Sequence, residues 1–97
     1  MFGDFQARQD AIQLKLDGIF VNASAGDGAI TVTANGNGKL TNVAIDASKI
    51  DVGDTEEIED LVLVAVNRCL ELAFQKGQDV SQNMMKDLLP PGLDNLF

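Results

Sequence analysis

The chain has 97 residues, of which 45% are hydrophobic and 23% are charged, which is typical of one globular domain and not of a disordered tail. It contains no His, Tyr or Trp and one Cys, so the usual neutral-pH general base, an internal disulfide and a structural zinc site are excluded. Seven basic and fifteen acidic residues give a net charge of −8, which repels polyanions at long range.

The first predicted element is a helix over residues 4–18, which Gly18 ends. Arg8 and Lys15 lie seven residues apart on one flank of its apolar stripe, about 10.5 Å along the helix axis. Two interpretations of this pair are open: contacts to neighbouring phosphates, or solvated cations beside an apolar stripe. The stripe itself, at about 100° per residue, contains Phe5, Ile12, Leu16 and Ile19.

Three short strands follow over residues 19–46, separated by Gly-rich turns, of which Gly26-Asp27-Gly28 is the first. Connections this short force antiparallel neighbours, so we predict a three-stranded meander. In the third strand Val43 and Ile45 share a face, whereas Leu40 is out of phase with them. That mismatch predicts either a β-bulge or an apolar contact on the other face.

A second and longer helix is predicted over residues 54–86, with Asp54 as its N-cap and Glu57 completing a capping box. The acidic residues at its start, Glu56 and Glu59 among them, complement the positive end of the helix dipole. The same two carboxylates are the pair that an enzyme could use, a hypothesis that lacks a His partner and recognisable pocket residues. We therefore expect no catalytic residue and no metal site.

The apolar surface of this second helix is wider than its own sheet requires. Its complete arc spans roughly 220°, about twice the stripe that covers one face of a sheet. A patch of Leu63, Leu70 and Phe74 lies beside the inner face, and a second copy of the helix is the simplest cover, so we predict a homodimer with these residues in the interface. The alternative is that the first helix covers the patch. The inner face itself contains Ile58, Leu61, Val62, Ala65, Cys69, Leu72 and Ala73.

The predicted C-terminal segment is residues 87–97, in which Pro90 and Pro91 stop the helix. Its last apolar residues, Leu93 and Phe97 among them, predict a tail that packs back on a groove.

No apolar run approaches the roughly 18 residues of a membrane-spanning helix, and the first ten residues lack the pattern of a secretory signal. Cys69, on the inner face of the second helix, is expected to be a small buried apolar residue, and a single cysteine favours a reducing compartment. We expect a cytoplasmic protein of one domain, residues 1–97, with no membrane and no small-molecule substrate.

Several motifs occur in a recognisable order. They are Met1-Phe2-Gly3, the glutamines Gln6, Gln9 and Gln13, the strand Gly28–Thr33 with Asn35-Gly36 after it, Val43-Ala44-Ile45-Asp46, and Leu89-Pro90-Pro91-Gly92. In this order and spacing the chain resembles the YbaB/EbfC family of bacterial nucleoid-associated proteins, over nearly its whole length.

This resemblance implies an α+β fold, with an α-β-β-β-α protomer whose three-stranded antiparallel meander packs on the long second helix. It also implies an intertwined, tweezers-like homodimer whose N-terminal helices project as arms. The implied function is binding of double-stranded DNA, mainly through backbone contacts with little sequence preference and without a cofactor, at the nucleoid. Arg8 and Lys15 of two arms would then neutralise about four phosphates, with a salt slope near −3.6. The alternative is an acidic protein-interaction module on the same scaffold that does not bind DNA and meets a basic partner.

Overall fold

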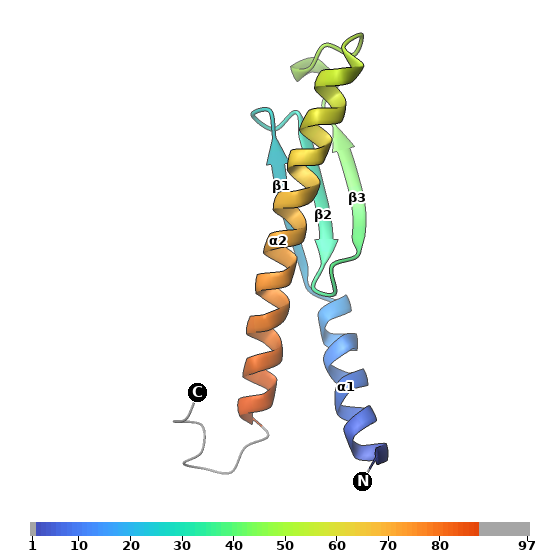
Figure 1. The fold of residues 1–97 in the computed structure, drawn as a ribbon, viewed down its shortest axis with the longest axis vertical. Coiled ribbons are helices and arrows are strands. Elements are labelled where there is room, and N and C mark those ends of the chain that lie inside the picture. Colours follow the sequence, from blue (N-terminus) through green and yellow to red (C-terminus); the bar gives the residue numbers. More distant parts are fainter. Residues whose placement is uncertain (1, 88–97) are drawn as a thin grey trace.

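The structure is a computed structural model that describes residues 2–87. It contains two helices and three strands in the predicted order, and the molecule is elongated, with extents of 58 × 27 × 16 Å (Figure 1). The elements are α1 (Phe2–Asp17), β1 (Phe20–Ala25), β2 (Ile30–Asn35), β3 (Leu40–Ile45), a 3₁₀ turn (Ala47–Lys49) and α2 (Thr55–Asp87). The predicted α-β-β-β-α order is therefore confirmed, and the predicted tail lies outside the described residues.

The three strands form one antiparallel sheet in the order β1-β2-β3. Between β2 and β3 the register shifts after Thr33, so that Ala34 pairs with Leu40. This β-bulge restores Leu40 to the face that carries Val43 and Ile45, because residues opposite each other in an antiparallel pair lie on the same face. Of the two possibilities open for Leu40, the bulge is the one that the structure confirms.

Helix α2 begins at the predicted cap, since the Glu57 backbone N–H donates to Asp54 Oδ1 at 3.1 Å. The reciprocal half of the capping box is replaced, because the Asp54 N–H donates to the Asp51 carbonyl at 2.9 Å. The helix then runs without interruption for 33 residues, through the buried Gly77.

The core lies between α2 and the first two strands (Figure 1). Small residues on the helix, Ala65 and Ala73 with Cys69 between them, allow its backbone to approach Ile30 and Val32 of β2 closely. The other members of this buried cluster are Ala25, Ala29 and Ala34. Burial also raises the pKa of the Cys69 thiol, so this residue is a small apolar core member, as predicted.

Helix α1 extends away from the sheet, in the same direction as the C-terminal half of α2 (Figure 1). Only its last part contributes to the packed body: Leu16 is buried, and Ile12 is half-buried, as is Ile19 just after the helix. Residues 6–11 are exposed. The molecule therefore has a body made of the sheet and half of α2, from which two helical arms project.

Candidate nucleic-acid interface

The two predicted DNA contacts, Arg8 and Lys15, both lie on α1 and both are exposed. Helical spacing separates their backbones by about 10.5 Å along the arm. The arm therefore offers two exposed cations along the surface of one helix. Such a surface suits contacts to a phosphate backbone better than recognition of a small molecule.

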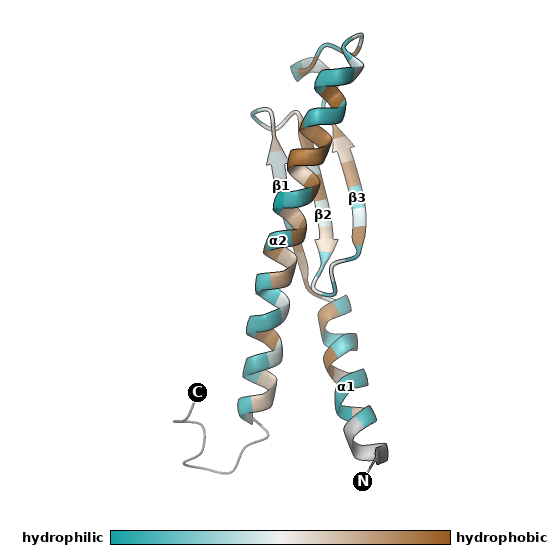
Figure 2. Ribbon diagram, in the orientation of Figure 1, coloured by the Kyte–Doolittle hydropathy of each residue, from teal (hydrophilic) through white to brown (hydrophobic). Residues whose placement is uncertain are grey.

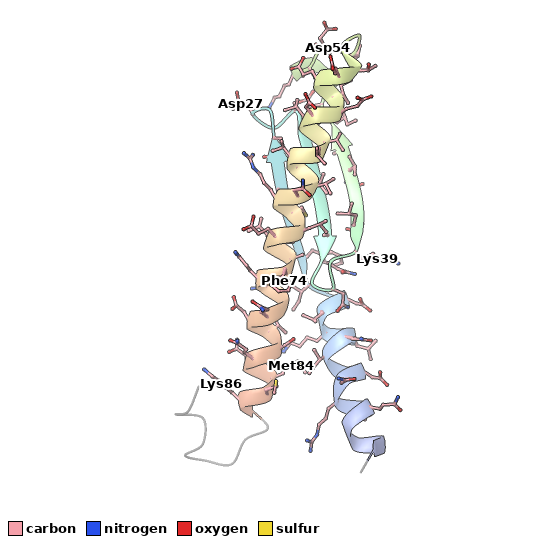
Figure 3. All side chains as sticks on the ribbon, in the orientation of Figure 1. Asp27, Lys39, Asp54, Phe74, Met84 and Lys86 are labelled. Atoms are coloured by element: carbon pink, nitrogen blue, oxygen red, sulfur yellow. The ribbon has the colours of Figure 1, made fainter. Side chains whose placement is uncertain are left out.

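Three further cations lie in the same half of the molecule. Lys76 and Lys86 are exposed on the C-terminal half of α2, and Lys39 is exposed in the turn between β2 and β3. Figure 3 labels Lys39 and Lys86. The sequence analysis did not select these residues because they are isolated in the sequence and α2 was read for its apolar arc. For Lys76 and Lys86 the available signal was their position beyond the end of the apolar run of α2.

The acidic residues gather at the opposite end, which is formed by the β1–β2 turn, the connection from β3 to α2 and the first turns of α2. Figure 3 places Asp27 and Asp54 there, far from Lys86. Hydrogen bonds from Ser48 hold the pKa of Asp46 below its ordinary value, so this carboxylate is charged at neutral pH. We call this region the acidic end; its eight carboxylates are Asp27, Asp46, Asp51, Asp54, Glu56, Glu57, Glu59 and Asp60.

The predicted interface patch of α2 is exposed in a single chain. The exposed fractions are 61% for Leu63, 36% for Leu70 and 66% for Phe74. Helix α1 leaves Leu63 and Phe74 mostly exposed, so the alternative in which the first helix covers the patch is wrong.

Strand β3 adds a second exposed apolar surface, which the sequence analysis missed. Leu40, Val43 and Ile45 lie on the face of the sheet that α2 covers over β1 and β2, yet they are 40%, 47% and 50% exposed. Figure 1 shows the reason: α2 crosses the first two strands and leaves β3 beside it. Val43 and Ile45 share a face, as apolar residues of a half-buried strand do, so the sequence contains no signal that this face is uncovered.

Other classes of site are poorly represented in the described residues. Glu56 and Glu59, the candidate carboxylate pair, are exposed. Residues 2–87 bring together no group of three potential metal ligands, and neither described helix has the length and hydropathy needed to span a bilayer.

Comparison with known proteins identifies the scaffold. Residues 1–91 match the YbaB/EbfC DNA-binding family. This chain belongs to that family. Relatives within it, each called a nucleoid-associated protein, occur in Thermodesulfovibrio yellowstonii (34% identical, covering 99% of this chain and 90% of the relative) and Chloroflexus aurantiacus (34%, covering 100% and 92%). A relative in Moorella thermoacetica is 44% identical, over 68% of this chain and 61% of its own length.

The fold of this YbaB/EbfC chain also occurs in a solved structure, an uncharacterized protein of Helicobacter pylori. The TM-score is 0.68, and the match covers 86% of this chain and 96% of that protein. At 20% identity the likeness concerns the fold alone.

Proposed function

We propose that this YbaB/EbfC chain is a nucleoid-associated protein that binds double-stranded DNA as a homodimer, through backbone contacts made by its projecting arms. The observation that carries the proposal is the separation of charge along the molecule. The acidic end has eight carboxylates and a single cation, Lys49. The rest of the sequence has seven acidic and six basic residues, and is therefore close to neutral.

Distance makes this separation effective. Twenty-one residues of α2 separate Glu56, in the acidic end, from Gly77, which is level with the start of the arms; at 1.5 Å per residue this is about 31 Å. The Debye length at 0.1 M ionic strength is about 10 Å. A phosphate at Arg8 or Lys15 therefore experiences little of the charge that dominates the net value of −8.

The homodimer is supported by the two apolar surfaces that one chain leaves uncovered. The α2 patch (Leu63, Leu70 and Phe74) and the β3 face (Leu40, Val43 and Ile45) border the same side of α2. Fully burying such a side chain is worth about 1.5–3 kcal/mol, so covering six of them is a substantial driving force. A second copy suits both surfaces, because a two-fold contact places the same patch on each protomer. Two protomers joined there would present two pairs of arms, as tweezers do.

The binding proposal is tested by fluorescence anisotropy of a labelled duplex at low salt. We expect a dissociation constant of about 10⁻⁴ to 10⁻⁶ M near physiological salt, with little difference between unrelated sequences. The Arg8→Glu variant should bind less tightly, because its arm then repels phosphate. Lys49→Glu is the matched control: it makes the same change of charge at the acidic end, and should bind like the wild type.

The association proposal is tested by sedimentation of Val43→Glu, which places a charge on the uncovered β3 face. Ala44→Glu is its control, because Ala44 pairs with Thr31 and points to the opposite face. We expect Val43→Glu to sediment at 10.4 kDa and the control at twice that mass.

The acidic end is the observation that favours the alternative, an interaction module for a basic partner without DNA binding. The two functions differ in their response to duplex. If the wild type gives no anisotropy change at 20 mM salt and about 100 μM protein, a concentration equal to the weakest dissociation constant expected near physiological salt, DNA binding is excluded.

A further inference from the structure

The turn Asn35–Gly38 between β2 and β3 lies where α1 ends and where α2 passes (Figure 1). Its Gly36 N–H donates to two carbonyls at the junction of α1 and β1, Leu16 O at 2.9 Å and Ile19 O at 2.8 Å. On the other side, a Cβ built on Gly77 would lie 2.7 Å from Gly36 O, closer than real Cβ atoms approach an oxygen. The backbones of α1, the sheet and α2 therefore meet at one residue.

Two asparagines extend this junction to the last turn of α1. Asn37 donates its Nδ2 to Gln13 O at 3.0 Å and to Asp17 Oδ1 at 2.6 Å. Asn35, only 6% exposed, donates its Nδ2 to the same Asp17 oxygen at 3.4 Å, while its Oδ1 accepts from the Asn37 and Lys39 N–H groups at 3.0 and 3.1 Å. The Asp17 carboxylate lies at the C-terminus of α1, where the helix dipole disfavours a negative charge. The hydrogen bonds from the two asparagine amides offset this unfavourable interaction.

The rest of α1 has few means of holding its direction, because residues 6–11 are exposed. Arg8 lies nine residues before Asp17, which is about 13.5 Å along the helix. A tilt of about 20° at Asp17 would move the Arg8 backbone by about 5 Å, more than the axial spacing of about 3.4 Å between phosphates of one strand. The direction of the arm therefore decides which phosphates its cations can reach.

We infer that the Asn35–Gly38 turn sets the direction of α1 relative to α2, with Asn37 and Asp17 as positioning residues and Gly77 as the contact that must lack a side chain. Hydrogen bonds from Asn37 hold the C-terminal end of α1, and the contact of Gly77 with Gly36 places α2 directly against the turn. The effect of this turn on DNA binding rests on the proposed function, whereas its effect on the direction of α1 does not.

The experiment measures the distance between α1 and α2 by double electron–electron resonance, with nitroxide labels attached at Ala11→Cys and Gln82→Cys. A Cys69→Ala background and an excess of unlabelled protein restrict the signal to pairs within one protomer. We expect Asn37→Ala to at least double the width of the distance distribution, because α1 loses its side-chain anchor. Its matched control is Asn42→Ala, the same substitution at an exposed position of β3, which should keep the wild-type width.

Two more variants keep the test independent of stability. Gly77→Ala should shift the mean distance, because its methyl group displaces the turn from α2. Adding Asp17→Ala to Asn37→Ala should broaden the distribution less than Asp17→Ala does in the wild type, because the Asn37–Asp17 contact is already lost and only the longer contact from Asn35 remains to be removed. Duplex affinity should fall about 3- to 10-fold in Asn37→Ala, the scale of one lost hydrogen bond.

The outcomes separate the two proposals. Wild-type distances in both Asn37→Ala and Gly77→Ala would overturn the positioning role, as would weaker DNA binding with an unchanged distribution. A wild type that fails to bind duplex, with distributions that respond as expected, would remove the DNA proposal and leave the positioning role in place.

Discussion

Strands β2 and β3 are neighbours whose larger apolar residues point to the same face of the sheet, yet these residues lie in opposite environments. Ile30 and Val32 of β2 are fully buried, whereas their direct partners Ile45 and Val43 of β3 are about half exposed. Hydropathy alone does not separate the two strands (Figure 2). The difference comes from α2, which covers β2 and leaves β3 beside it (Figure 1).

The apolar pattern of a strand therefore indicates which face becomes buried, but it does not indicate which element buries that face. For β2 the cover is α2 of the same chain. For β3 no element among residues 2–87 provides the cover, and the neighbouring flank of α2 carries its own exposed Leu63, Leu70 and Phe74. The second copy proposed above would account for both observations.

The largest contrast is expected between Ile30→Ala and Ile45→Ala, the same substitution at two paired positions. Measured by urea denaturation in the monomeric Val43→Glu background, Ile30→Ala should lower the free energy of unfolding by about 2–5 kcal/mol, because it leaves a cavity in the core. Ile45→Ala should lower it by less than about 1 kcal/mol. Equal losses would mean that β3 is covered within one chain.

Association should depend next most strongly on Phe74, the most exposed residue of the α2 patch. Phe74→Ala should raise the dimer dissociation constant by about 30-fold, the effect of losing about 2 kcal/mol at an aromatic anchor. Gln75→Ala, on the adjacent exposed position, is the control and should leave self-association unchanged. Sedimentation across a concentration series measures both.

The salt dependence of duplex affinity tests whether DNA binding requires the dimer that forms through the β3 face. If the two α1 arms of a dimer bind together, the wild-type slope of log affinity against log salt should be about −3.6, from Arg8 and Lys15 of each protomer. The monomeric Val43→Glu variant keeps one Arg8 and one Lys15, so its slope should be about −1.8. A slope that does not change on loss of the dimer would show that one pair of arms acts alone.

The smallest effect is a pH dependence of stability that distinguishes the covered half of the sheet from the uncovered half. Burial under α2 raises the pKa of Cys69, so between the ordinary thiol pKa of about 8.5 and the raised value the folded state binds more protons than the unfolded state. The free energy of unfolding should therefore fall as the pH rises above about 8.5, by at most about 1.4 kcal/mol per pH unit. In the monomeric Val43→Glu background, Cys69→Ala should lose this dependence, and adding Ile45→Cys to it should not restore the dependence.

Much of the architecture could be predicted because its signals are local. The cap at Asp54, the turn at Gly26–Gly28 and the bulge beside Leu40 depend on residues close in the chain, and the structure contains all three. For the candidate site, the exposure of Arg8 and Lys15 followed from helical spacing. Their role in binding DNA stays a prediction.

By itself, the sequence determined the order and type of the elements and the excess of apolar surface on α2, because periodicity and turn residues act over a few positions. The tertiary structure alone decided that β3 is left uncovered by α2, and that Asn37 and Gly77 meet the end of α1 through one turn. These depend on where α2 crosses the sheet. Contacts between residues 20 or more positions apart arise from that crossing, and no local pattern encodes it.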